Sequence, residues 1–142
     1  MAVKIFLDAN VILDFLLKRP HYHQSRQLFQ LIVDHRVSAI TSPSIVHILI
    51  YWLGKAYGPV QCRSMLSLLF QDVEVAAVDH QLVQEALHGS MRDLEDALQY
   101  HTALRHRADY FVSRDADFKR DATTALPVLT PEELLETLDE KS

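Results

Sequence analysis

The amino-acid sequence predicts an α/β protein with three layers, α/β/α, around a mostly parallel central sheet of four to five strands. Short β-rich runs alternate with longer amphipathic stretches along the whole chain. This alternation implies crossover connections, and hence a parallel sheet with helices on both faces. The 142 residues, 49% hydrophobic and 23% charged, suit a single globular domain over residues 1–142. No repeat, linker or change of composition divides the chain.

The first half of the chain is expected to combine two strands with four helices. The strands are Val3–Leu7 and residues 37–40. Pro20 ends the first helix, and Ser42 and Pro43 supply the cap and the first-turn proline of the third. The helices are expected over residues 11–18, over residues 25–33, from residue 43 through 53 with an end near Gly58, and from Pro59 onward with Cys62 on the buried stripe.

The second half is expected to add three strands and three helices. Asp79 can cap a helix that Gly89 closes, and Thr130 and Glu133 form a capping box for the last helix. Pro127 would suit an edge strand. The strands cover residues 73–78, 110–112 and 126–129, and the helices cover residues 80–88, residues 94–106 and the stretch from Pro131.

Acidic residues fall where the expected strands end. Asp8 follows the first strand and Asp115 follows the fourth, while Asp93 and Asp96 lie in the first turn of a helix, three residues apart. Ligand sites of open parallel sheets lie beyond the carboxyl ends of the strands. Gathered carboxylates repel one another unless a cation is present, and their hard oxygens suit Mg²⁺ or Mn²⁺. The pattern therefore indicates a magnesium-type site.

Each of these residues also has a purely structural interpretation. Asp8 or Asn10 can cap the first helix, Asp93 can cap its own helix, and Asp115 can form an Asx turn. The coincidence of these residues at strand ends favours a site. Four other acidic residues are expected to be solvated charges or turn residues, namely Asp14, Asp34, Asp72 and Asp109.

Three segments resemble the acidic motifs of PIN-domain nucleases, and in particular of the small VapC-type toxins of bacterial toxin–antitoxin pairs. Residues 5–14 resemble the first motif, residues 93–99 the third and residues 112–118 the fourth. The likeness extends from Val3 to the last helix. It implies a PIN-like fold and a metal-dependent ribonuclease acting on RNA, with one or two Mg²⁺ or Mn²⁺ ions. The catalytic residues and metal ligands that it implies are Asp8, Asp96 and Asp115. The auxiliary residues are Asn10, Asp93, Ser113 and Asp117.

The second motif departs from the family pattern, because His47 stands where the family has a glutamate. An imidazole is softer than a carboxylate and holds Mg²⁺ less well, although Mn²⁺ tolerates it better. His47 is thus either an auxiliary metal ligand or a polar residue satisfied by a neighbouring helix or by RNA. The same residue supports an alternative function, a non-catalytic PIN-like module that binds RNA or protein through a degenerate metal site. A phosphohydrolase of small phosphate esters is a third possibility, disfavoured because only three glycines are present.

The expected helix over residues 45–53 is apolar nearly all round, so it is either central to the core or shared with another chain. We expect Tyr51 and Trp52 to lie in a dimer or antitoxin interface. The resemblance adds that VapC-type proteins commonly form homodimers and are bound by a small antitoxin protein.

The net charge of −5 argues at first sight against a nucleic acid partner. The charge is localised, however. The residues from Thr130 onward carry −4 and the four carboxylates of the expected site carry another −4, so the rest of the chain is mildly basic. Five neighbouring basic residues have two possible interpretations. They form a basic rim that contacts phosphates or an acidic partner, or they are an ordinary solvated surface. These residues are Lys18, Arg19, His21, His23 and Arg26.

A cytoplasmic location is expected. One cysteine cannot form an internal disulfide, and the apolar N-terminal stretch lacks the features of a targeting segment. The longest apolar run, residues 45–53, is far shorter than the ~20 residues that cross a bilayer. No membrane partner is therefore expected.

Overall fold

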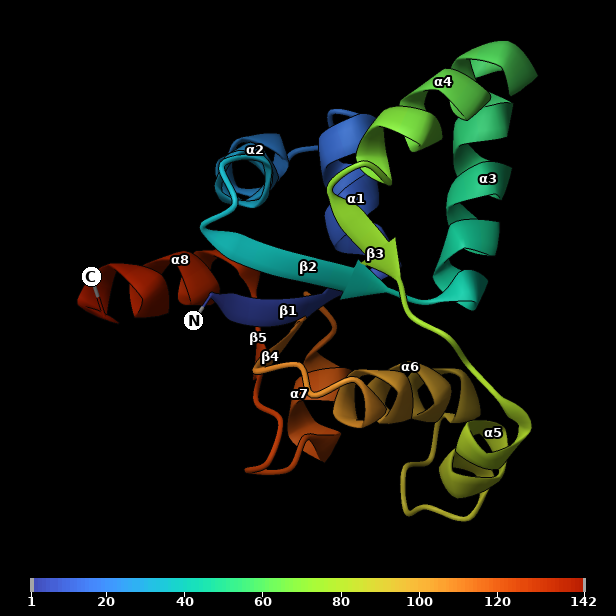
Figure 1. Cartoon of the computed structure of the whole chain (residues 1–142), viewed down its shortest axis with the longest axis vertical. Coiled ribbons are helices and arrows are strands. Elements are labelled where there is room, and N and C mark those ends of the chain that lie inside the picture. The colour runs from blue at the N-terminus through green and yellow to red at the C-terminus, as the bar shows by residue number, and fades with distance from the viewer. Residues whose placement is uncertain (1, 142) are drawn as a thin grey trace.

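Five parallel strands form the central sheet of the protein, in the order β3-β2-β1-β4-β5. The structure, a computed structural model, describes residues 2–141. Helices pack on both sides of the sheet (Figure 1), which confirms the predicted α/β/α class. The strands are β1 (Val3–Leu7), β2 (Val37–Thr41), β3 (Val73–Val75), β4 (Tyr110–Val112) and β5 (Val128–Leu129).

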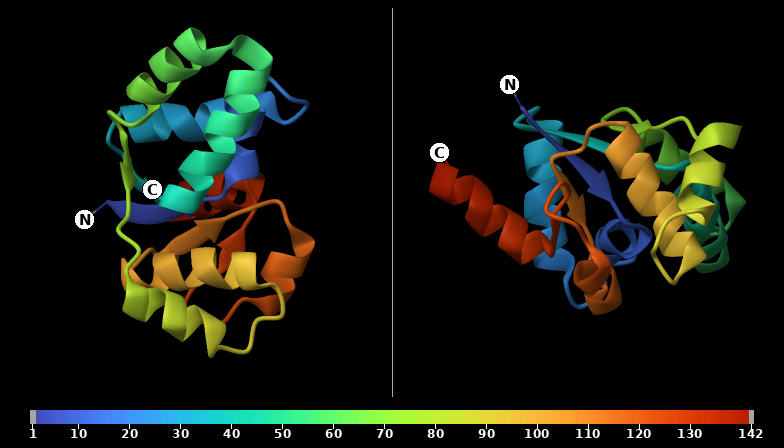
Figure 2. Two further views of the ribbon diagram at one scale, coloured as in Figure 1. Left: turned by 90° about the vertical axis from the view of Figure 1, so that its right-hand side faces the viewer. Right: turned by 90° about the horizontal axis from the view of Figure 1, so that it is seen from below.

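Two pairs of helices lie at opposite ends of the molecule. Figure 2 shows α3 and α4 at one end and α5 and α6 at the other, while α2 packs against α1, β2 and α8. The bounds are α1 (Ala9–Leu16), α2 (Tyr22–Val33), α3 (Pro43–Tyr57), α4 (Pro59–Leu69), α5 (His80–Leu87), α6 (Leu94–Arg105), α7 (Ala116–Asp121) and α8 (Pro131–Lys141). None of the helices within residues 2–141 is long and apolar enough to cross a membrane.

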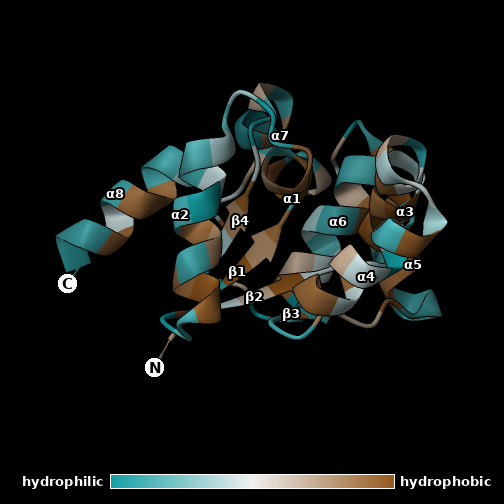
Figure 3. Ribbon diagram, turned by 90° about the horizontal axis from the view of Figure 1, so that it is seen from above, coloured by the Kyte–Doolittle hydropathy of each residue, from teal (hydrophilic) through white to brown (hydrophobic). Residues whose placement is uncertain are grey.

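Hydrophobic residues concentrate in the strands and in α1 at the middle of the molecule (Figure 3). Phe6 of β1 stacks on Phe111 of β4, with ring centroids 4.8 Å apart, and Phe111 stacks on Phe118 of α7 at 4.2 Å. The Tyr100 hydroxyl donates to the carbonyl of Leu126 (2.7 Å) and so joins α6 to the segment before β5. These contacts hold β4 between β1 and the C-terminal third of the chain.

The capping residues predicted from the sequence are confirmed. The side chains of Ser42 and Asp79 accept backbone N–H bonds at the starts of α3 and α5. Thr130 and Glu133 form the reciprocal capping box of α8, at 2.9 and 3.1 Å. Gly58 has a φ of 84°, a conformation open to glycine, and this allows α4 to begin directly after α3.

Several predicted boundaries are wrong. β3 ends at Val75 rather than at residue 78, because its partner β2 ends at Thr41, whose carbonyl accepts the N–H of Ala76 (2.8 Å). α1 covers Ala9–Leu16 instead of residues 11–18, since Asp8 caps it and Lys18 takes a φ of 54° that no helix allows.

Two further boundaries also differ from the prediction, and one helix was not predicted. α2 starts at Tyr22, three residues before the predicted start. β5 is restricted to Val128–Leu129 at the edge of the sheet, as its proline neighbour suggested. The short helix α7 was not expected from the sequence.

Candidate active site

Asp8 lies at the end of β1, where it caps α1. Its Oδ1 accepts the N–H of Ala9 (2.8 Å) and its Oδ2 accepts the hydroxyl of Ser113 (2.8 Å). Burial raises the pKa of Asp8, the hydrogen bonds from Ser113 and Ala9 lower it, and the nearby charge of Asp115 raises it; the net shift is upward. Asp8 is therefore both the cap of α1 and a residue of the candidate site.

Ser113 and Asp115 follow β4 and face the end of β1. The buried Ser113 hydroxyl donates to Asp8 and accepts the N–H of Asp115 (3.1 Å). Asp115 caps α7, with its Oδ1 accepting the N–H of Asp117 (2.9 Å). One hydroxyl thus connects the two acidic segments, which are more than 100 residues apart in the chain.

Asp96 completes the group from the first turn of α6. Burial raises its pKa to about 6, with further contributions from the charges of Asp93, Asp115, Asp8 and Glu95. Asp93 caps the same helix by accepting the N–H of Asp96 (3.0 Å). The acidic residues predicted from the sequence therefore affect one another, although they come from three separate segments.

The other predicted residues lie at the margin of this group. Asn10 accepts a hydrogen bond from Arg19 (3.2 Å), which brings a cation from the predicted basic rim to the residue next but one to Asp8. Asp117 is exposed and pairs with Arg120 at 2.9 Å. His47 is exposed on α3, and within residues 2–141 its imidazole forms no hydrogen bond or ion pair.

The carboxylate oxygens of this acidic group are ligands of the type that hard divalent cations prefer, and their negative charge would be neutralised by such an ion. Within residues 2–141, no three Asp, Glu, His or Cys side chains lie close enough together to hold an ion as they stand. Ligation would therefore require the carboxylates to turn toward one another.

A buried network beside Asp96 was not predicted. Gln99, one turn further along α6, accepts a hydrogen bond from the Ser42 hydroxyl and donates to the Ser44 hydroxyl (2.5 Å). These bonds fix the start of α3 against α6. In the sequence, two serines at the start of a helix indicate a cap, but they do not show that Gln99 is their partner.

The interpretation of Asp14 as a solvated charge is wrong, whereas Asp34 and Asp109 are exposed as expected and Asp72 lies in a turn. Asp14 is only 6% exposed and accepts a hydrogen bond from Arg114 Nε (3.1 Å). The same guanidinium donates two bonds to Glu132, at 2.9 and 2.7 Å. Burial alone would raise the pKa of Glu132, but the bonds from Arg114 hold it below its usual value.

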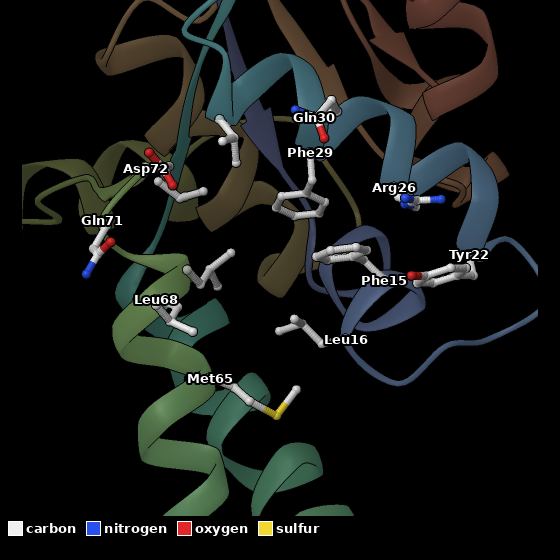
Figure 4. Close-up of a pocket in the computed structure, with 13 residues that line it drawn as sticks. Phe15, Leu16, Tyr22, Arg26, Phe29, Gln30, Met65, Leu68, Gln71 and Asp72 are labelled. Carbon is white, nitrogen blue, oxygen red and sulfur yellow. The ribbon is translucent and has the colours of Figure 1, made fainter.

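Away from the acidic group, an apolar groove of about 420 Å³ runs between α1, α2 and α4. Figure 4 shows Phe15, Tyr22 and Phe29 along one wall and Met65 and Leu68 on the other. Phe15 stacks on both other rings, at 5.8 and 4.7 Å between centroids. The three stacked rings make one wall of the groove aromatic.

A second apolar surface lies on α3, as expected for Tyr51 and Trp52. Ile45, Leu49 and Leu53 fill the buried side of the helix, and Ile48, Ile50, Tyr51 and Trp52 are exposed. Lys55 lies over both aromatic rings, 5.6 and 5.9 Å from their centroids.

The sheet changes its direction of growth between β1 and β4, since β2 and β3 lie on one side of β1 and β4 and β5 on the other. Such a switch point opens a crevice at the carboxyl ends of the two strands, where α/β proteins bind ligands. Asp8 and Asp115 follow the two strands that border it. Fold and site thus define a doubly wound α/β protein with an acidic site at its switch point.

The chain belongs to the PIN domain family. The profile of that family matches residues 4–117, a span that contains all of the predicted site residues. This match confirms the resemblance read from the three acidic motifs.

Similar proteins include VapC-type proteins of bacteria. Ribonuclease VapC1 of Aquifex aeolicus (strain VF5) is 27% identical over 142 residues, which cover 94% of each chain. A solved structure of VapBC2 from Rickettsia felis, bound to a DNA fragment from its promoter, gives a TM-score of 0.66 at 19% identity, over 90% of this chain and 98% of that chain. A toxin–antitoxin complex from Klebsiella pneumoniae gives a TM-score of 0.67 at 18% identity, over 89% and 97%. At these identities the solved structures show a shared fold.

The raised pKa of Asp96 predicts an unusual pH dependence of stability. The folded state holds this proton more tightly than the unfolded state, so the free energy of unfolding falls as pH rises from about 4 to about 6. Without divalent ions, Asp96→Asn should therefore raise the melting temperature at pH 7.5 and have little effect near pH 4. Asp34→Asn, at the amino-terminal edge of the sheet, is the control and should act alike at both pH values. A destabilising Asp96→Asn at pH 7.5 would contradict the electrostatic argument.

Proposed function

We propose that this protein is a Mg²⁺- or Mn²⁺-dependent endoribonuclease that acts in the cytoplasm as the toxin of a toxin–antitoxin pair. The observation that carries the proposal is the gathering of Asp8, Asp96 and Asp115 at the switch point of the sheet. The charges that act on Asp96 are all negative. The similarity of the whole chain to a protein named Ribonuclease VapC1 supports RNA cleavage as the proposed reaction.

Asp8, Asp96 and Asp115 are the proposed ligands of the ion, and Asp93 is an auxiliary carboxylate on the same helix turn as Asp96. When bound, a divalent cation would lower the pKa of water and stabilise negative charge on the leaving oxygen of a phosphodiester. Ser113 holds Asp8 in place through its hydroxyl.

The phosphates of an RNA backbone are negatively charged, so RNA that binds beside this acidic centre needs basic side chains around it. Arg19 lies at the margin of this centre, since its guanidinium donates to Asn10, two residues after Asp8. We assign Arg19, with the neighbouring Lys18, to phosphate contacts at the margin of the site.

A non-catalytic binding module is the second candidate function, and His47 is the observation that favours it. The family's glutamate would add a fourth carboxylate, whereas an exposed imidazole without a partner among residues 2–141 adds none. A protein of this kind would bind RNA or protein without taking up Mn²⁺.

Purified protein should cleave structured RNA only when Mg²⁺ or Mn²⁺ is present. Asp8→Asn and Asp115→Asn should each reduce the rate by about 100-fold or more, because even the partners of metal ligands typically contribute 10- to 100-fold. The measurement is the rate of cleavage on denaturing gels, with and without EDTA. Asp109→Asn, an exposed carboxylate at the other end of β4, is the matched control and should retain activity. Absence of cleavage together with absence of Mn²⁺ binding in calorimetry would favour the binding module instead.

We assign the apolar groove between α1, α2 and α4 to the antitoxin. Its aromatic wall and its polar rim of Arg26, Gln30 and Asp72 suit an amphipathic segment of a partner protein. Toxin–antitoxin complexes among the proteins of similar fold support a partner of this type.

Leu68→Arg should prevent inhibition of the ribonuclease by its antitoxin protein. Leu68 is 63% exposed in the groove, so the substitution leaves the core intact while placing a charge in the proposed interface. The measurement is RNA cleavage during titration with that protein. Val60→Arg, on the same helix but outside the groove and 83% exposed, should remain inhibited. Full inhibition of Leu68→Arg would rule out the groove as the docking surface.

We assign the exposed side of α3 to a homodimer. Double substitution of Tyr51→Ser and Trp52→Ser should convert the protein from dimer to monomer, because exposed aromatic residues dominate such interfaces. Light scattering after size-exclusion chromatography measures the change. Val33→Ser removes an exposed apolar residue from α2 and should leave the dimer intact. An unchanged mass for the double variant would place the interface elsewhere.

A further inference from the structure

The segment Ser113–Arg114–Asp115 is attached to α1 at two points. Ser113 bonds Asp8 at the start of that helix, and Arg114 bonds Asp14 within it. Six residues separate the two attachment points, about 9 Å along a helix that rises ~1.5 Å per residue. Two separate contacts restrain both the position and the rotation of the segment relative to α1.

The Arg114 contact is strong because it is charged, forked and largely buried. Its side chain is 19% exposed, and it holds Asp14 with Nε and both Glu132 oxygens with its two terminal nitrogens. Bidentate guanidinium–carboxylate pairs are strong and geometrically specific, and removal of one partner of a buried pair leaves an uncompensated charge.

The sheet and α8 do not depend on this contact for their own connection. The N–H of Ser113 donates to the carbonyl of Leu129 (3.0 Å), which pairs β4 with β5 up to the segment. The capping box of Thr130 and Glu133 starts α8 independently. What Arg114 adds is the orientation of the residues immediately after β4.

We propose that Arg114 is a positioning residue that sets the distance between the Asp8 and Asp115 carboxylates, and thereby the affinity of the site for its cation. This inference rests on the proposed metal-dependent function. Asp14 and Glu132 act with Arg114: one holds it against α1, the other against α8. A lysine in its place keeps the charge but cannot bridge both carboxylates with the same geometry.

The test is calorimetric titration with Mn²⁺ combined with steady-state RNA cleavage. Arg114→Gln should weaken Mn²⁺ binding at least about tenfold and lower kcat, with KM for RNA changed less than about twofold. Arg114→Lys should recover only part of the affinity. Arg105→Gln removes the same charge from a pair with Glu85, at the end of α6 opposite Asp96, and both its affinity and its kcat should equal those of the wild type.

A double variant separates positioning from stability. Arg114→Gln leaves the buried Asp14 with only its longer ion pair to Arg19 (3.9 Å), so Asp14→Asn combined with Arg114→Gln should regain much of the lost melting temperature. Its Mn²⁺ affinity should stay weak. Recovery of affinity together with stability would overturn the proposal, as would wild-type Mn²⁺ affinity in Arg114→Gln.

Amide hydrogen exchange gives a reading that does not depend on the metal. In Arg114→Gln the N–H of Asp115, which bonds the Ser113 hydroxyl, should lose protection, while the N–H of Phe111, which bonds the carbonyl of Pro127, should keep it. Unchanged protection of Asp115 would also overturn the proposal. If the wild-type protein takes up no Mn²⁺ and cleaves no RNA, the proposed function itself fails, and this role of Arg114 fails with it.

Discussion

The pairing of β1 with β4 determines where the chemistry of this protein can occur. Leu7 is in register with Val112, and the N–H of Asp8 bonds the Val112 carbonyl at 3.1 Å, so the two strands end side by side. Stacking of Phe6 on Phe111 secures the pair from within the core. Since each strand is followed by an aspartate, the topology brings two carboxylates together that are more than 100 residues apart in sequence. The remaining strands extend the sheet on either side of this pair.

The acidic site opposes folding in the absence of a cation. Burial and like charge raise the pKa of Asp8 and bring that of Asp96 to about 6, which means that both carboxylates bind a proton more tightly in the folded than in the unfolded chain. Asp8, Asp93 and Asp115 still serve as helix caps, so part of the electrostatic cost is offset by backbone hydrogen bonds. The capping role and the proposed ligand role of these residues are therefore compatible. The sequence alone presented them as alternatives.

Local patterns predicted the parts of the molecule that depend on local physics. The alternation of strands and helices, the caps at Ser42 and Asp79 and the acidic residues at strand ends all follow from neighbouring residues. Asp14 could not be interpreted correctly, because its partner Arg114 lies 100 residues away and Glu132 still further along the chain. The helix α7 was not predicted because its six mostly polar residues carry no periodic pattern. Its one buried side chain, Phe118, stacks on Phe111 of β4.

We propose that the carboxylates at the ends of β1 and β4 and at the start of α6 form a cation site. Anomalous X-ray diffraction from crystals grown with Mn²⁺ tests it most directly, because the signal locates the ion without reference to activity. We expect an anomalous peak within bonding distance of Asp8, Asp96 and Asp115. A Mn²⁺-loaded crystal with no peak there, or with its peak at another cluster, would contradict it.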